Sequence, residues 1–72
     1  MSDHTYRLIE IAGTSTEGVS QAIANGVDRA AATLRGLDWF EVTSIRGFVD
    51  NDTVQHFQVQ MKVGFRLEDK VD

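Results

Sequence analysis

The sequence contains neither cysteine nor proline. Without cysteine, the 72-residue chain can form no disulfide, no thiolate metal site and no cysteine nucleophile. Its two histidines, His4 and His56, stand far apart and lack metal-ligand spacing. A domain of this size buries only about 60% of the surface of its unfolded chain. Such domains usually depend on disulfides, a metal or self-association, so these absences favour self-association.

Positive charge and long hydrophobic runs are also scarce. Seven Lys and Arg against eleven Asp and Glu give a net charge of −4, and nucleic-acid binding usually needs a basic surface. No apolar run approaches the length of a membrane span. Residues 1–4 are polar, where a secretory signal would be hydrophobic. We therefore expect no nucleic-acid partner, no membrane partner and a cytoplasmic location.

The composition that remains is typical of a globular α+β domain. With 42% hydrophobic and 25% charged residues, it predicts one domain over residues 1–72, ordered from about 4 to 68. Strands are predicted at residues 5–12, 38–49 and 53–67, where β-branched and aromatic residues are frequent. Between the first two, apolar residues recur every three or four positions and predict a helix; they are Val19, Ile23, Val27, Ala30 and Leu34. Thr14 and Glu17 have capping-box spacing, which places the helix start there.

The last predicted strand alternates strictly from residue 57 to residue 67. Its apolar face should cover the helix, and it consists of Phe57, Val59, Met61, Val63, Phe65 and Leu67. Residues 50–52 have turn composition, so the last two strands should pair as an antiparallel hairpin. One helix cannot cover both faces of a three-stranded sheet. Strand 38–49 has bulky apolar groups on both faces, with Trp39 and Ile45 on one and Phe40, Val42 and Phe48 on the other. The uncovered groups predict an interface or a ligand surface.

Catalytic chemistry has little support in the sequence. Ser, His and Asp all occur, but neither histidine lies near a serine in a recognisable motif. His56, on the polar face of a strand, is typical of a surface or interface residue, and a cofactor-free enzyme that uses it stays as an alternative. Residues 13–15 precede the helix and could hold an anion there, although capping explains them more simply.

Three residues indicate a flat aromatic ligand, each with a plainer alternative. Trp39 offers a flat surface on which such a ligand would stack. Its plainer interpretation is an aromatic residue of the core or of a subunit interface. Gln58 offers an amide donor and acceptor to a heterocycle edge, or is a solvated surface residue. Arg46 donates to a ligand carbonyl or phosphate, or pairs with a carboxylate between subunits. Because Trp39 and Arg46 have opposite strand parity, one site needs a β-bulge between them or an Arg46 from a neighbouring subunit.

Several segments together carry a family resemblance. They are Arg-Leu-Ile-Glu-Ile at 7–11, Gly-Thr-Ser at 13–15, Leu-Asp-Trp-Phe-Glu-Val at 37–42, Arg-Gly at 46–47 and the closing strand 57–67. In order and spacing, from about residue 5 to residue 67, the sequence resembles the dodecin family. The resemblance implies a β-α-β-β protomer whose three-stranded antiparallel sheet wraps partly around its helix. It also implies assembly with copies of itself into a hollow dodecamer.

The resemblance further implies a function without turnover, and hence no enzyme. Flavin (FMN, riboflavin or FAD) would be stored, buffered and photoprotected as pairs stacked between tryptophans of neighbouring subunits. Trp39 matches that tryptophan, Gln58 matches the glutamine at the isoalloxazine edge, and Arg46 matches an arginine at the pocket. Arg29 and Arg66 resemble positions that meet the phosphates of coenzyme A in some members. The alternative is a structural homo-oligomer, or a binder of another ligand such as coenzyme A.

Overall fold

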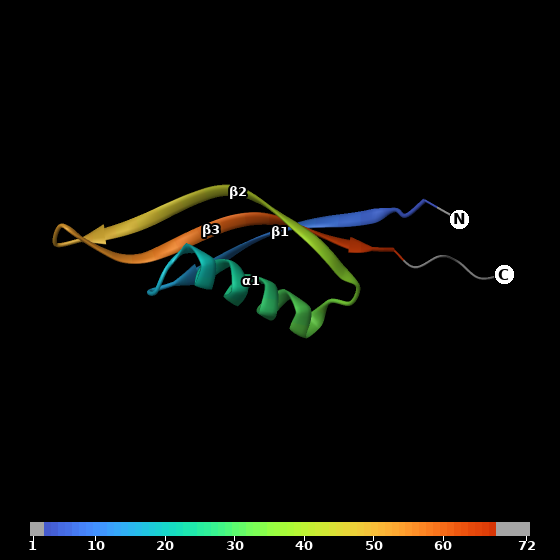
Figure 1. Cartoon of the computed structure of the whole chain (residues 1–72), viewed down its shortest axis with the longest axis horizontal. Helices are drawn as coiled ribbons and strands as arrows, with labels where there is room; N and C mark the ends of the chain where they lie inside the picture. Colours follow the sequence, from blue (N-terminus) through green and yellow to red (C-terminus); the bar gives the residue numbers. More distant parts are fainter. Residues whose placement is uncertain (1–2, 68–72) are drawn as a thin grey trace.

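The computed structural model describes residues 3–67 as one sheet crossed on one face by one helix (Figure 1). The elements in chain order are β1 (Tyr6–Ser15), α1 (Val19–Thr33), β2 (Leu37–Asp50) and β3 (Thr53–Arg66). The strand order is β1-β3-β2, and both neighbouring pairs are antiparallel. The predicted β-α-β-β order is confirmed, whereas the predicted end of the ordered region, at about residue 68, lies outside the described residues. No helix within 3–67 is long and apolar enough to cross a membrane.

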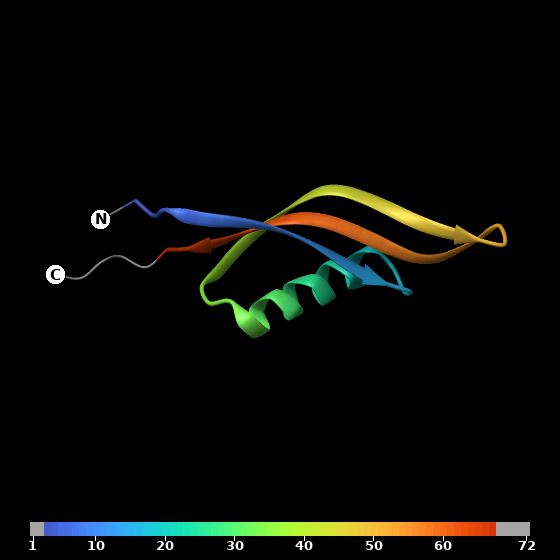
Figure 2. The ribbon, with the colours of Figure 1, turned by 180° about the vertical axis from the view of Figure 1, so that it is seen from behind.

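Strand β3 lies at the centre of the sheet and supplies most of the core. Its alternation places Val59, Met61 and Val63 against α1, where each is at most 1% exposed. Ala22 on the helix completes this buried cluster. The prediction that the apolar face of this strand covers the helix is therefore confirmed, and Figure 2 shows the same sheet from behind.

A tight turn joins β2 to β3. Asn51 and Asp52 both adopt left-handed backbone conformations, with φ of 56° and 61°. Two such residues in succession suit the right-handed twist of a hairpin, and Asn and Asp tolerate this conformation better than most residues. The hairpin therefore forms one long ribbon that extends past α1 (Figure 1).

The predicted capping box is wrong, because β1 continues through Thr14, the residue that would have capped the helix. Thr14 and Ser15 pair with Gln58 and Phe57 of β3 as the last residues of the strand. The helix begins after Gly18 and has no side-chain cap. Pairing with β3 therefore outweighs the local capping pattern. It also keeps residues 13–15 in the strand, so the alternative of an anion site at the helix start is not formed there either.

Glycines allow α1 to lie directly on β1. A Cβ atom at Gly26 would lie 3.0 Å from Met61 Cε and 3.3 Å from Gly13 Cα. A Cβ atom at Gly13 would collide with the carbonyl oxygen of Ala22. Glycine costs a helix about 1 kcal/mol relative to alanine, and at Gly26 the cost is offset by this close backbone approach.

The helix covers β1 and β3 but leaves β2 open. Only five hydrophobic residues within 3–67 are buried, whereas nine large ones are exposed. Six of the nine lie on β2: Trp39, Phe40, Val42, Ile45, Phe48 and Val49. The radius of gyration is 15.2 Å, against about 11 Å for a compact 72-residue chain. An elongated protomer with a bare apolar strand supports the expected self-association.

Substitution of Gly13 by alanine should destabilise the protein by about 1–3 kcal/mol, because the new methyl group must displace the Ala22 carbonyl. Chemical unfolding at one fixed protein concentration measures the cost. Gly18→Ala is the matched control, since nothing lies within 4 Å of its Cβ position, and it should cost less than about 1 kcal/mol. Equal costs for the two variants would contradict the close helix–strand contact.

Candidate functional site

A bulge in β2 turns Trp39 and Arg46 to the same side of the sheet. Trp39 lies opposite Gly64, and Arg46 lies opposite Gln58. The register shifts between them, at Thr43, so one extra residue corrects their opposite parity. Gly64 and Gln58 share a face because they are an even number of residues apart. The expected bulge is therefore present, and we call this side, away from α1, the outer face.

The same bulge overturns part of the predicted face assignment of β2. Ile45 was expected on the Trp39 side, but it pairs with the buried Val59 and so lies on the helix side of the sheet. Phe48 was expected beside Phe40 and Val42, but it lies on the outer face and stacks on His56. The Phe48 and His56 ring centroids are 4.5 Å apart with 20° between the planes. Strict alternation fails in β2 because each irregularity reverses the faces of the residues beyond it.

The predicted ligand residues form two groups at opposite ends of the outer face. Gln58 and Gly64 are six residues apart along β3, a separation of about 20 Å. Arg46 and Gln58 are direct cross-strand neighbours, whereas Trp39 lies at the other end of the strand pair. One protomer thus brings Arg46 together with Gln58 but does not bring Trp39 to them.

Hydrogen bonds order the polar end of the outer face. Arg46 Nη2 donates to Gln60 Oε1 at 3.4 Å, and Ser44 Oγ donates to the same oxygen at 2.7 Å. Gln58 is partly buried beside them. These bonds hold the Arg46 guanidinium against Gln60 of β3, and Gln58 is the residue directly opposite Arg46 in the strand pair.

Trp39 rests on the β3 backbone at Gly64. A Cβ atom at Gly64 would collide with the indole ring carbons, so only glycine leaves room for the ring as it lies. Tyr6 reaches Trp39 across β3 from β1, with ring centroids 5.9 Å apart and 68° between the planes. This edge-to-face geometry is favourable for aromatic pairs. The indole is nevertheless 37% exposed, so part of it remains accessible to a ligand.

A carboxylate fixes the other end of Tyr6. The Tyr6 hydroxyl donates to Asp38 Oδ2 at 2.8 Å, and Asp38 is the extra residue at an irregularity between Leu37 and Trp39. This hydrogen bond is the largest cause of the raised pKa of Tyr6; desolvation and the negative charge of Asp38 also raise it, and Arg66 opposes them. The sequence analysis missed this group, because which residues meet across a central strand depends on register. The one signal available in the sequence was Gly64, a residue without a side chain in the regular alternation of residues 57–67.

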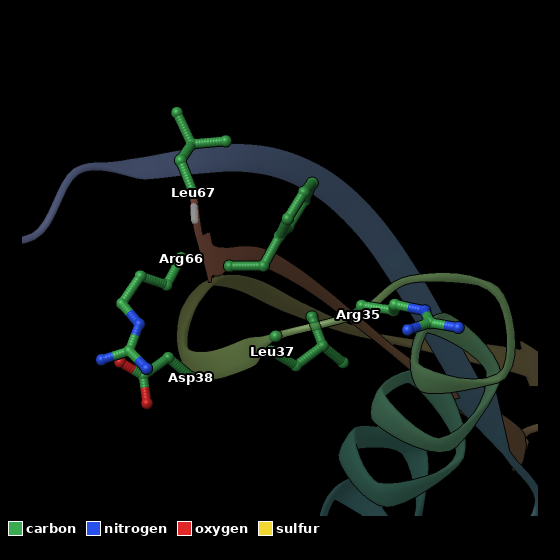
Figure 3. A pocket seen from close by; sticks show the side chains of 7 residues that line it. Arg35, Leu37, Asp38, Arg66 and Leu67 are labelled. Atoms are coloured by element: carbon green, nitrogen blue, oxygen red, sulfur yellow. The ribbon is translucent and has the colours of Figure 1, made fainter. Parts of the chain in front are cut away.

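Arg66 lines a surface pocket where β2 begins and β3 ends. The pocket has a volume of about 540 Å³, and Arg35 and Asp38 also line it. In Figure 3 the Arg66 side chain reaches toward Asp38, while Arg35 lies on the other side of Leu37. Arg66 Nη1 is 3.1 Å from His4 Nε2. Arg35, which the sequence analysis did not single out, gives this pocket a second positive charge.

Arg29 lies elsewhere on the protomer. It lines a separate surface pocket of about 450 Å³ on α1 with Asn25, Asp28 and Ala32. The two arginines predicted to meet phosphates, Arg29 and Arg66, are therefore not brought together within one chain.

Comparison with known proteins agrees with this fold. The family model for Dodecin matches residues 5–68. The chain belongs to the dodecin family. It is 50% identical over 64 residues to a dodecin of Thermus thermophilus, covering 89% of this chain and 93% of that dodecin. Dodecin structures from Streptomyces davaonensis and Streptomyces coelicolor are each 57% identical with a TM-score of 0.89. They cover 94% and 97% of this chain, and 100% of each dodecin is matched. The resemblance seen in the sequence is thus confirmed.

The Tyr6–Asp38 bond predicts the direction of a titration. Because folding raises the pKa of Tyr6, the stabilisation is present below its ordinary value of 10.0 and is lost as pH rises through the folded pKa. Phenolate absorbance of this single tyrosine should titrate at higher pH in folded than in unfolded protein. Asp38→Asn should lower the folded midpoint, and Asp52→Asn, in the hairpin turn, should leave it unchanged. Equal midpoints for folded and unfolded wild type would contradict the bond.

Proposed function

We propose that this dodecin binds a flavin, as FMN, riboflavin or FAD, at a site completed by two copies of the chain. The main support for this two-copy site is the separation of about 20 Å between Trp39 and the Arg46–Gln58 pair on one outer face. A two-fold axis relates identical surfaces in opposite directions. An antiparallel contact between two outer faces would therefore set Trp39 of one copy beside Arg46 and Gln58 of the other.

The residue types of these two groups fit the isoalloxazine ring. An indole seated on a flat strand offers a plate for stacking, and aromatic pairs gain roughly 0.5–1.5 kcal/mol beyond area burial. The Gln58 amide matches a ring edge that carries both donors and acceptors. The Arg46 guanidinium suits a ring carbonyl or a phosphate. When bound, the flavin supplies light absorption and redox chemistry, while these side chains stack on it and orient it.

The proposed role is storage, buffering and photoprotection rather than turnover. Dodecins are in general not enzymes, which agrees with the expected non-enzymatic function. A tryptophan in direct contact with a flavin quenches its excited state by donating an electron. This proposal is supported by the setting of Trp39, whose ring lies on Gly64 and against Tyr6 yet stays partly accessible.

Self-association is part of the same proposal. Membership of the family implies a homo-oligomer, and we infer the hollow dodecamer expected from the sequence. The uncovered helix-side residues of β2, Phe40, Val42 and Ile45, supply apolar contact area for it. Association would then bury the strand that α1 leaves open and complete the ligand site at the same time.

A phosphate-bearing ligand such as coenzyme A is a second candidate. The support is the pocket of about 540 Å³ to which Arg35 and Arg66 each contribute a positive charge. Arg29 could take part only from another copy, because it lies on a separate pocket.

Removal of the indole tests the flavin site. Trp39→Ala should weaken FMN binding by at least about 10²-fold, the scale of a binding hot spot, and should abolish emission quenching. Trp39→Phe should retain weaker binding because a ring remains. The measurement is a titration of protein into dilute FMN with flavin emission as readout, and light scattering reports the oligomer mass.

Three results would contradict this account. Unchanged FMN affinity in Trp39→Ala would remove Trp39 from the site. Loss of the oligomer in that variant would assign the residue a structural role. Failure of wild-type protein to quench FMN would leave an oligomer whose ligand is not a flavin.

A further inference from the structure

The only tryptophan and the only tyrosine of the chain touch one another. They come from different strands, Trp39 from β2 and Tyr6 from β1, and the indole lies on Gly64 of the strand between them. The hydroxyl of Tyr6 ends on a carboxylate, Asp38 Oδ2, at 2.8 Å. We propose that Tyr6 and Asp38 form a proton-coupled electron donor that restores Trp39 after its indole has lost an electron.

The geometry suits electron transfer between the two rings. Their centroids are 5.9 Å apart, close enough for direct contact between the π-systems. Gly64 leaves the indole in this position, since any Cβ there would occupy the space of the ring. An electron passing from Tyr6 to Trp39 therefore needs no intermediate residue.

Asp38 supplies the base that oxidation of a tyrosine requires. A phenol becomes strongly acidic when it loses an electron, so its proton must go to an acceptor within hydrogen-bond reach. An ionised carboxylate is an acceptor only, and Asp38 Oδ2 already holds the hydrogen bond from the Tyr6 hydroxyl. Proton transfer can accompany electron transfer without rearrangement of either side chain.

The step balances in atoms and charge. The Tyr6 phenol gives one electron to the oxidised indole, its O–H bond breaks, and a new O–H bond forms on Asp38. An indole radical cation, a phenol and a carboxylate become a neutral indole, a neutral phenoxyl radical and a neutral carboxylic acid. When an electron returns to the phenoxyl radical, the proton moves back and the starting state is restored. The positive charge of the oxidised indole and the negative charge of Asp38 are both neutralised, so the net charge of the three groups is zero before and after the step.

Before the step begins, Tyr6 already carries the proton that it must lose. The Tyr6 hydroxyl is protonated near neutral pH, since its pKa is raised above the ordinary value of 10.0 by the hydrogen bond to Asp38. Arg66 is the cation whose charge acts on Tyr6, and it lines the same pocket as Asp38. In biological terms the relay rests on the proposed function, because excited flavin stacked on Trp39 would be the one-electron oxidant. The relay itself belongs to three residues of one chain and is present without any ligand.

The test therefore uses the flavin-free protein. Azide radicals generated by a radiolysis pulse oxidise the indole, and absorbance then follows the tryptophanyl and tyrosyl radicals separately. We expect the tryptophanyl signal to decay as the tyrosyl signal rises, with one rate that does not depend on protein concentration. With a single residue of each kind, both signals have unique sources.

Three variants assign the roles. Tyr6→Phe keeps a ring beside Trp39 but should abolish the tyrosyl signal and prolong the tryptophanyl signal. Asp38→Asn keeps a hydrogen-bond acceptor of the same shape but should slow the transfer by roughly 10²-fold, as loss of a general base does. Asp52→Asn removes a carboxylate from the distant turn and should leave the rate unchanged. Circular dichroism and Trp39 emission establish that each variant is folded.

Two outcomes would overturn the proposal. One is a wild-type tryptophanyl signal that decays no faster than that of Tyr6→Phe, which excludes Tyr6 as the donor. The other is an unchanged rate in Asp38→Asn, which excludes Asp38 as the base. Neither outcome depends on flavin, so failure of the relay is separable from failure of flavin binding.

Discussion

A single helix lying over a three-stranded sheet sets the conditions for everything else in this protein. Helix α1 covers β1 and β3, and the buried cluster it forms with them is small. On the helix side of β2, Phe40, Val42 and Ile45 remain 36% to 55% exposed. Full burial of such a side chain is worth about 1.5–3 kcal/mol, against a net stability of roughly 5–15 kcal/mol for a domain. Because these three side chains are already about half buried, covering them gains roughly 2–4 kcal/mol. That is a substantial fraction of the stability of a domain, which is why self-association and folding belong together here.

Irregularities in the pairing of β2 with β3, rather than regular alternation, determine which side chains of β2 lie on the outer face. The extra residue at Thr43 turns Trp39 and Arg46 to one side of the sheet. Asp38 is the extra residue at another irregularity, and its side chain accepts a hydrogen bond from the Tyr6 hydroxyl. Bulges of this kind redirect side chains next to sites in many sheets. The central strand β3 also shapes this face, because Gly64 has no side chain and so leaves room for the indole of Trp39.

Much of the fold follows from sequence patterns that agree at several levels. The strict alternation of residues 57–67 predicts the central strand and its buried face, and the turn residues predict the hairpin. The failures have one cause, which is that pairing across the sheet overrides local signals. Thr14 and Glu17 match a capping box, yet pairing with β3 keeps Thr14 in β1. Ile45 changes face because a bulge, invisible in the residue types, precedes it.

The site was only partly predictable for the same reason. Trp39, Gln58 and Arg46 could be selected by side-chain chemistry, since a plate, an amide and a guanidinium suit a flat heterocycle. Their division into two groups about 20 Å apart needs the register of β2 on β3. The contacts of Trp39 with Tyr6 and Gly64 likewise need the strand order β1-β3-β2, which brings residues from the two ends of the chain together. Side-chain chemistry thus selects the candidate binding groups, and the register separates them, which is why the proposed site draws on two copies of the chain.

Complementation between two defective chains tests this claim most directly. Trp39→Ala lacks the stacking plate, and the double variant R46A/Q58A lacks the polar end, so each alone should fail to quench FMN. Refolded together into mixed oligomers, they should recover about a quarter of the wild-type sites, because random partnering sets an intact Trp39 opposite an intact Arg46–Gln58 pair that often. Mixed oligomers of wild-type mass that recover no quenching would show that each site is built within one chain, and would contradict the account.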